Sequence, residues 1–223
     1  MKKIQSSIIC LSIIIVSFLS ANAQDTAFLS DIQKFKKQDS VSFPLKNAIL
    51  FTGSSSFTKW KDVQNYFPNY KIINRGFGGS TLPDVIRYAK DIIIPYQPKQ
   101  VVIYSGDNDL ASSDTITPQI VTKRFKTLFQ IIRTNLPKAN IAFVSIKPSP
   151  SRKQLMPKME QTNRLIKSFL QKQKNTSFID VYHPMLLSDG KPIGAIFLQD
   201  SLHMNAKGYA IWKKAIQPHL SKK

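Results

Sequence analysis

Three consecutive serines, Ser54 to Ser56, follow a short apolar run and a glycine. The run, residues 48–51, is typical of a buried strand, and residues 57–63 are typical of a helix start. A turn from strand to helix lies at the carboxyl edge of a sheet, where open α/β sheets bind ligands. A serine in this turn can act as a nucleophile, or it can serve only as the N-cap of the helix.

His203 is the histidine whose surroundings best suit it to activate such a serine. It follows a loop and has Asp200 three residues before it, whereas His183 comes just after a predicted strand and His219 lies four residues from the C-terminus. At that spacing the Asp200 carboxylate can accept a hydrogen bond from one imidazole nitrogen while the other faces Ser55. The pattern therefore predicts a serine, a base and an orienting acid.

Donors for a developing oxyanion are present in two further polar loops. Acyl transfer through a serine needs such donors, and removing one typically slows the reaction on the order of 100-fold or more. The backbone N–H groups of Ser55 and Gly79 and the side-chain amide of Asn108 are the candidates. We expect all three to converge on one substrate oxygen.

Predicted strands and helices alternate along the chain and position these loops. The strands are expected at 48–51, 71–74, 100–104, 140–146 and 177–181, and the helices at 25–41, 57–66, 82–94, 117–132, 156–174 and 205–216. Such alternation predicts a mostly parallel sheet with helices on both faces. The expected fold is a three-layer α/β/α sandwich around a five-stranded, flavodoxin-like sheet, with the polar loops at one edge.

The four loops resemble, in composition and order, the sequence blocks of the SGNH or GDSL hydrolase family. The matching residues are Gly53-x-Ser55, Gly76-Phe77-Gly78-Gly79, Gly106-Asp107-Asn108-Asp109 and Asp200-x-x-His203. The resemblance covers nearly the whole chain after its first residues, and it implies ester hydrolysis on the three-layer fold without a metal or organic cofactor.

The resemblance also implies a role for each of these site residues. It makes Ser55 the nucleophile, Asp200 and His203 the rest of the triad, and Gly79 and Asn108 the partners of the Ser55 N–H in the oxyanion hole. One departure is Ser54, which stands where the family has an aspartate that supports the loops. This change leaves Ser54 and Ser56 as rival nucleophiles, although the family register favours Ser55.

Three basic residues, Arg75, Lys147 and Arg152, lie near the same predicted edge. They are candidates for binding an anionic group of the substrate. The alternative is that they are solvated surface residues or members of loop salt bridges. No group of residues in the sequence has the spacing of a metal site.

The first 23 residues predict export of the protein. A basic start, an apolar segment and an Ala-x-Ala arrangement before Gln24 are typical of a secretory signal peptide, which leaves one predicted hydrolase domain at residues 24–223. The apolar segment is too short for a stable membrane anchor. The single cysteine, Cys10, lies within it, so we expect no disulfide and a bacterial periplasmic or extracellular location.

The charge of the chain does not predict a nucleic-acid partner. There are 32 lysines and arginines against 13 acidic residues, a formal net charge of +19, but the basic residues are scattered. Nucleic-acid grooves instead cluster them and interleave them with aromatic residues.

The sequence therefore predicts a secreted serine esterase, with a short acyl group such as acetyl on a glycan as the favoured substrate. A lysophospholipase-type acylhydrolase is one alternative. A non-catalytic glycan- or envelope-binding module that keeps the fold is another, and Ser54 is the feature that favours it.

Overall fold

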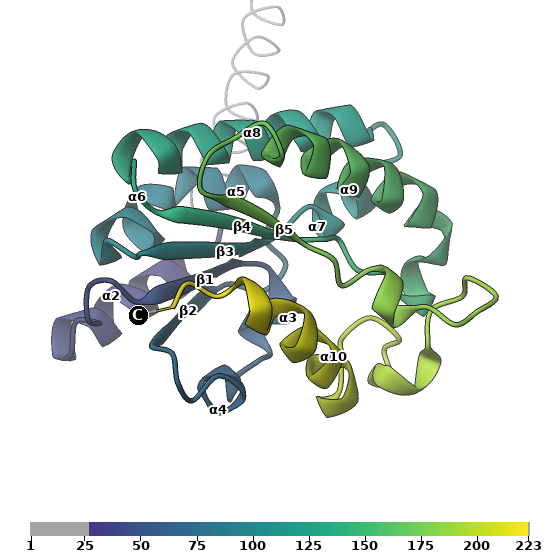
Figure 1. The fold of residues 1–223 in the computed structure, drawn as a ribbon, viewed down its shortest axis with the longest axis horizontal. Coiled ribbons are helices and arrows are strands. Elements are labelled where there is room, and N and C mark those ends of the chain that lie inside the picture. Colours follow the sequence, from purple (N-terminus) through teal and green to yellow (C-terminus); the bar gives the residue numbers. More distant parts are fainter. Residues whose placement is uncertain (1–26, 223) are drawn as a thin grey trace, which may run out of the picture.

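A five-stranded parallel sheet forms the middle layer of the protein in the computed structural model, which describes residues 27–222 (Figure 1). The strand order is β2-β1-β3-β4-β5, and every neighbouring pair is parallel. The strands are β1 (Ile49–Gly53), β2 (Ile72–Gly76), β3 (Gln100–Tyr104), β4 (Asn140–Val144) and β5 (Thr176–Ile179). The predicted fold class is confirmed, while the predicted signal peptide at residues 1–23 lies outside the described residues.

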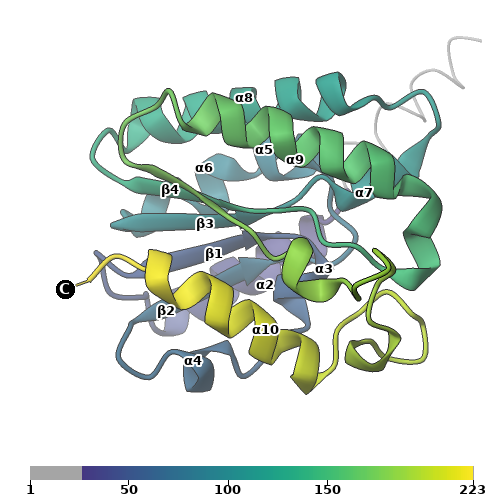
Figure 2. The ribbon, with the colours of Figure 1, turned by 45° about the vertical axis from the view of Figure 1, so that its right-hand side comes forward.

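Helices cover both faces of the sheet, as Figures 1 and 2 show. One face carries α5 (Leu82–Arg87), α6 (Ala89–Ile92), α8 (Pro118–Asn135) and α9 (Met156–Leu170), with α2 (Leu29–Val41) packed against α6. The other carries α3 (Ser55–Thr58), α4 (Val63–Tyr66) and α10 (Ala206–Ile216). Helix α7 (Asp107–Ser112) follows β3. The 3-10 helices are η1 (Ile94–Tyr96), η2 (Pro150–Leu155), η3 (His183–Met185), η4 (Gly194–Ile196) and η5 (Gln217–His219). Within residues 27–222, no helix combines the length and the apolar character needed to cross a bilayer.

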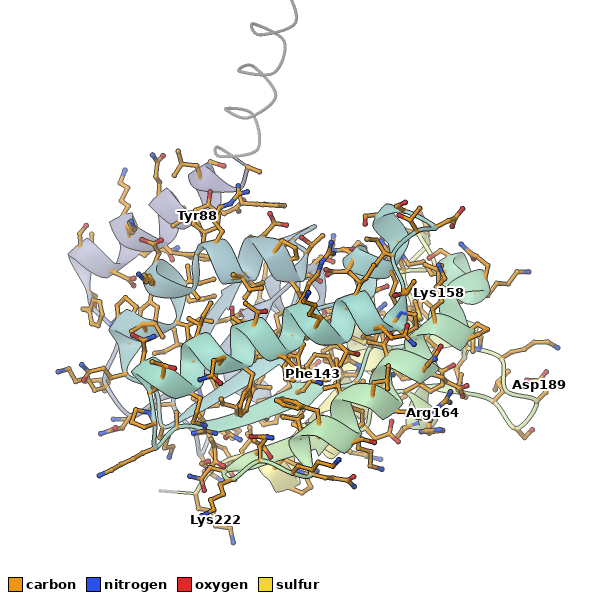
Figure 3. The ribbon with its side chains drawn as sticks, turned by 90° about the horizontal axis from the view of Figure 1, so that it is seen from above. Tyr88, Phe143, Lys158, Arg164, Asp189 and Lys222 are labelled. Carbon is orange, nitrogen blue, oxygen red and sulfur yellow. The ribbon has the colours of Figure 1, made fainter. Side chains whose placement is uncertain are left out.

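The side chains of each strand alternate between two hydrophobic cores. Leu50 and Val101 pack into the core under α5, α6, α8 and α9, whereas Phe51 and Val102 pack into the core under α3 and α10. Successive strand residues point to opposite faces, so a strand covered on both faces must be apolar at every position. Figure 3 shows Phe143 of β4 between α8 and α9, where its ring lies 4.8 Å from that of Phe125.

Two predicted helices are interrupted in the structure. The expected helix at 57–66 is divided into α3 and α4, because Trp60 turns inward, is fully buried and stacks on Tyr209 at 4.7 Å. The expected helix at 82–94 is broken at Tyr88, which has a non-helical ψ of 8° and donates its hydroxyl to the backbone oxygen of Ala27. In both cases a contact between an aromatic residue and a distant segment, a ring stack for Trp60 and a hydrogen bond for Tyr88, outweighs local helix propensity.

Candidate active site

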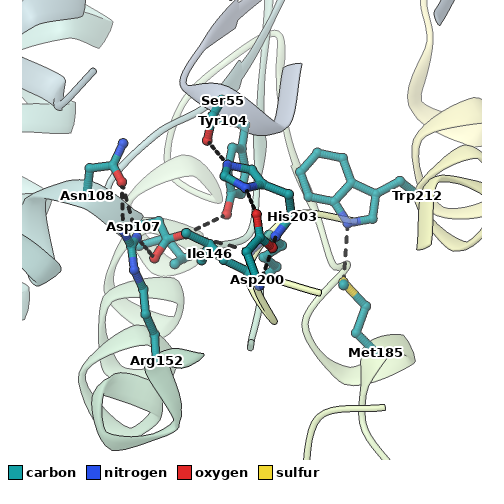
Figure 4. Close-up of polar contacts among 12 residues, drawn as sticks. Ser55, Tyr104, Asp107, Asn108, Ile146, Arg152, Met185, Asp200, His203 and Trp212 are labelled. Carbon is teal, nitrogen blue, oxygen red and sulfur yellow. Dashed lines mark hydrogen bonds and ion pairs between the residues drawn. The ribbon is translucent and has the colours of Figure 1, made fainter. Parts of the chain in front are cut away.

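Ser55, His203 and Asp200 form a continuous chain of hydrogen bonds at the carboxyl edge of the sheet (Figure 4). His203 Nε2 lies 3.0 Å from Ser55 Oγ, and His203 Nδ1 lies 2.6 Å from Asp200 Oδ2. Asp200 Oδ1 also accepts from the backbone N–H groups of Leu202 and His203, at 3.0 and 2.9 Å. The bond from the His203 side chain, followed by these backbone bonds, holds the pKa of Asp200 well below its ordinary value. An ionised Asp200 keeps the imidazole proton on Nδ1, so that Nε2 presents its lone pair to Ser55.

The turn after β1 places Ser55 within hydrogen-bond distance of His203. Gly53 ends the strand with a φ of 129°, and a Cβ atom there would lie 1.8 Å from the backbone oxygen of Tyr104, so only glycine fits. Ser54 and Ser56, the two neighbours of Ser55, are each only 3% exposed. Ser54 occupies the N-cap position without a capping hydrogen bond from its side chain. Of the three serines, Ser55 is therefore the one whose hydroxyl contacts His203.

Two side chains that the sequence interpretation did not single out hold α3 in place. Asn74 Nδ2 donates to the backbone oxygen of Phe57 at 2.7 Å, and Asn74 Oδ1 accepts from Gly76 N at 3.0 Å. The hydroxyl of Tyr209 in α10 donates to the backbone oxygen of Ser56 at 2.9 Å. A polar residue at the end of a predicted strand, directly before a glycine-rich loop, is the signal that points to Asn74.

The glycine-rich loop after β2 runs beside Ser55. Phe77 N donates to the backbone oxygen of Gly53 at 2.9 Å, and a Cβ atom at Gly78 would lie 3.9 Å from Ser55 Cβ. Gly79 has a φ of 83°, a conformation that favours glycine. The ring of Phe28 covers this loop, 3.8 Å from a Cβ atom built on Gly79 and 5.2 Å from the centre of the Phe77 ring.

Asn108, in the first turn of α7, is hydrogen-bonded to the same loop. Its Nδ2 donates to the backbone oxygen of Ser80 at 3.0 Å, and its Oδ1 accepts from Arg152 (Figure 4). The structure thus brings the Gly79 loop and Asn108 to the edge that carries Ser55.

The three basic candidates, Arg75, Lys147 and Arg152, are all engaged in ion pairs. Arg75 pairs with Asp39 of α2 and donates from Nε to the hydroxyl of Tyr96 in η1 at 2.7 Å, so the structure does not bring it to Ser55. Lys147 and Arg152 both converge on Asp107, with Nζ of Lys147 3.7 Å from Oδ2 and Nη1 of Arg152 2.6 Å from Oδ1.

Lys147 is a buried cation. Its side chain is 1% exposed, and Nζ lies 5.6 Å from the centre of the Phe197 ring. Burial lowers the pKa of Lys147, and the neighbouring Asp107 carboxylate offsets part of this effect. The ammonium group of Lys147 therefore faces Asp107 and the Phe197 ring rather than solvent.

A second Asp-x-x-His pair, Asp180 and His183, repeats the local geometry of Asp200 and His203. Asp180 Oδ2 lies 2.6 Å from His183 Nδ1, and Oδ1 accepts from the backbone N–H of Tyr182 at 2.9 Å. The side chain of His183 is 72% exposed, and among residues 27–222 no serine hydroxyl is hydrogen-bonded to it. A carboxylate three residues before the histidine was used to select His203 from the sequence, and the same spacing before His183 was overlooked. The fold, rather than the spacing, distinguishes the two pairs. Nor does any group of three or more His, Cys, Asp or Glu residues in this part of the chain have an arrangement that can hold a metal ion.

A family model of the GDSL-like Lipase/Acylhydrolase family matches residues 44–211. The chain belongs to this family. It is therefore a hydrolytic enzyme of the esterase class, and the resemblance noted in the sequence is confirmed. None of the curated proteins matches the chain.

Solved structures of other proteins share the fold at low sequence identity. A GDSL-like lipase from Bacteroides thetaiotaomicron VPI-5482 superposes with a TM-score of 0.71 at 20% identity, over 84% of this chain and 96% of that one. A catalytic mutant of an acetylxylan esterase from Geobacillus stearothermophilus superposes with a TM-score of 0.62 at 15% identity, over 80% of this chain and 96% of that one. At this level of identity the likeness is one of fold.

Proposed function

We propose that the protein is a secreted serine esterase that cleaves a carboxylic ester through an acyl-enzyme on Ser55. The observation that carries this proposal is the unbroken hydrogen-bond chain from Ser55 through His203 to Asp200. Such a chain has little use in a protein that only binds a ligand, and it supplies a nucleophile, a base and an orienting carboxylate.

In the proposed acylation step, Ser55 Oγ bonds to the ester carbonyl carbon while its proton passes to His203 Nε2. The ionised Asp200 stabilises the resulting imidazolium, and the carbonyl electrons move to the oxygen. That oxyanion accepts hydrogen bonds from the Ser55 N–H, the Gly79 N–H and Asn108 Nδ2, each aimed at charge that develops only in the reaction. Collapse breaks the bond to the leaving group, which takes the proton from Nε2 and departs as an alcohol.

Deacylation repeats the sequence with water as the nucleophile. Water loses a proton to His203 Nε2 as its oxygen bonds to the acyl carbon, and the same three donors bind the second oxyanion. Collapse of this intermediate releases the carboxylic acid and returns the proton to Ser55 Oγ.

For the substrate we favour a short acyl group, such as acetyl on a glycan. The fold relative that acts as an acetylxylan esterase supports this choice. Residues 27–222 also contain no long apolar insertion of the kind that covers long acyl chains. The proposed location is the bacterial periplasm or exterior, on the strength of the predicted signal peptide at residues 1–23.

The test compares hydrolysis of p-nitrophenyl acetate and p-nitrophenyl palmitate by the wild type, Ser55→Ala and Ser54→Ala, with circular dichroism to verify folding. We expect the wild type to hydrolyse p-nitrophenyl acetate faster than p-nitrophenyl palmitate. Hydrolysis of the acetate ester should be lost in Ser55→Ala and should persist in Ser54→Ala. A fluorophosphonate should label the wild type at Ser55, which mass spectrometry of the labelled peptide identifies. Folded wild type that neither hydrolyses an ester nor reacts with the probe would favour the binding module. Preference for palmitate would favour a lysophospholipase-type enzyme.

A further inference from the structure

Arg152 holds one end of the Asn108 side-chain amide. Its Nη1 and Nη2 both donate to Asn108 Oδ1, each at 3.1 Å, while Asn108 Nδ2 at the other end donates to the backbone oxygen of Ser80 at 3.0 Å (Figure 4). An amide group is nearly symmetric in shape, so its hydrogen-bond partners decide which end carries the oxygen. A guanidinium group contains only donors and is satisfied only by the oxygen end.

Arg152 is itself fixed by its surroundings. Nη1 also donates at 2.6 Å to Oδ1 of Asp107, whose side chain is 6% exposed, and the side chain of Arg152 is 19% exposed. The other oxygen of Asp107 accepts from the Tyr104 hydroxyl at 3.3 Å and lies 3.7 Å from Lys147 Nζ. The backbone of the same segment is bonded to the loop that carries Asp200, because Ser151 N donates to the oxygen of Ser201 at 3.1 Å.

We propose that Arg152 is a positioning residue that fixes the orientation of Asn108, so that Nδ2 rather than Oδ1 faces the oxyanion. This inference rests on the proposed function. With the amide reversed, a carbonyl oxygen would face the developing negative charge, and one donor would be replaced by a repulsive group. Both Nη atoms of Arg152 are already engaged, Nη1 with Asp107 Oδ1 and both with Asn108 Oδ1, so the contribution of Arg152 is orientation rather than an anion-binding site for the substrate.

A double-mutant cycle tests this role. The values of kcat and KM for p-nitrophenyl acetate are measured for the wild type, Arg152→Met, Asn108→Ala and the double variant. We expect Asn108→Ala to lower kcat about 100-fold or more and Arg152→Met to lower it at least about tenfold, with KM nearly unchanged. The double variant should be no slower than Asn108→Ala, because Arg152 has nothing left to orient.

A neighbouring ion pair supplies the matched control. Arg124 Nη1 lies 2.7 Å from Oδ1 of Asp109, the residue after Asn108, and makes no hydrogen bond to Asn108 itself within the part of the chain that is described. Arg124→Met removes the arginine that pairs with Asp109, a buried aspartate in α7, the helix that also carries Asn108. We expect it to lower the unfolding temperature and to leave kcat of the folded enzyme within about threefold.

The outcomes that overturn the inference differ from those that overturn the proposed function. If Arg152→Met lowers kcat by the same factor in the wild-type and Asn108→Ala backgrounds, Arg152 has a general structural role. A rise in KM in both backgrounds indicates substrate binding instead. If Arg152→Met does not fold, Arg152→Lys replaces it in the cycle, because a single ammonium group keeps a cation beside Asp107 without the two-pronged contact to Asn108.

Nuclear magnetic resonance reads the orientation without turnover. The side-chain amide signals of Asn108 are assigned by their loss in Asn108→Ala. We expect Arg152→Met to shift them and to speed their exchange with water, and unchanged signals would overturn the inference. If the wild type hydrolyses no ester, the proposed function fails, while this measurement still decides what Arg152 does to Asn108.

Discussion

Replacement of Asp200 by asparagine should change the tautomer of His203 while keeping the backbone hydrogen bonds of the loop at residues 200–203. The Oδ1 atom of asparagine can still accept from the backbone N–H groups of Leu202 and His203, at the 3.0 and 2.9 Å separations seen for Asp200. The amide Nδ2 then stands where Oδ2 now lies, 2.6 Å from His203 Nδ1. Because that nitrogen donates, it favours the tautomer with the proton on Nε2, which presents a hydrogen rather than a lone pair to Ser55.

The expected cost follows from this tautomer and from the exposure of Asp200. The equivalent change in a serine protease lowers kcat about 10⁴-fold. Here the Asp200 side chain is 46% exposed, so water can take over part of its role in stabilising the imidazolium. We therefore expect Asp200→Asn to lower kcat by about 10² to 10⁴, a loss of about 3 to 5 kcal/mol in transition-state stabilisation, with little change in the unfolding temperature.

Asp180→Asn is the matched control for this prediction. It makes the same substitution in a pair with the same internal geometry, but one in which no serine of residues 27–222 is hydrogen-bonded to the histidine. Both variants are assayed with p-nitrophenyl acetate over a range of pH, and their unfolding is followed by circular dichroism. The reasoning is refuted if Asp200→Asn keeps more than about a tenth of the wild-type kcat, or if Asp180→Asn loses activity to the same degree.

Three further substitutions, one of them paired with a control at Gly190, probe the fold around the site. The free energy of unfolding of the wild type minus that of Lys147→Met should be larger at about pH 9.5 than at about pH 7. Burial lowers the pKa of Lys147, so the unfolded wild type binds more protons than the folded protein in that range, and its stability rises with pH. Gly53→Ala should not reach the native fold, whereas Gly190→Ala, with no atom within 4 Å of its new Cβ, should cost about 1 to 2 kcal/mol for its left-handed φ. Tyr209→Phe should lose about 1 kcal/mol of stability with its bond to Ser56.

Each of these three predictions has a clear contrary result, which is read by chemical denaturation for Lys147→Met and Tyr209→Phe and by circular dichroism and activity for Gly53→Ala. A stability difference for Lys147→Met that shrinks as the pH rises would contradict a lowered pKa. Native-like circular dichroism and activity in Gly53→Ala would contradict the close approach of the turn to β3. An unchanged midpoint for Tyr209→Phe would mean that water replaces the bond to Ser56.

The sequence predicted the three layers of the fold and the edge of the sheet that carries the candidate site, because both depend on local sequence pattern. A strand covered on both faces is apolar throughout, as residues 48–51 and 101–103 are, and polar loops at strand ends must meet at one edge of a parallel sheet. The structure brings Ser55, His203 and Asp200 together as that reasoning expects. Their roles in catalysis stay a proposal.

Interactions between distant segments explain what the sequence could not predict. The predicted second strand ended at Asn74, which put Arg75 in a loop, but β2 continues to Gly76. Alternation along the strand then turns Arg75 to the face opposite Asn74, toward Asp39. Likewise, the inward turn of Trp60 depends on Tyr209, and the pairing of Arg152 with Asp107 depends on how η2 packs against α7.

The contact of Phe28 with the loop around Gly79 has a practical consequence for protein engineering. Residues 27 and 28 lie against Tyr88 and Gly79, so a tag or fluorescent protein fused directly before them would begin beside the loop that flanks Ser55. At the other end of the chain, the backbone oxygen of Lys222 accepts from Lys99 Nζ, next to the start of β3 and hence at the opposite edge of the sheet. Purification tags, surface immobilisation and reporter dyes therefore belong at the carboxyl terminus.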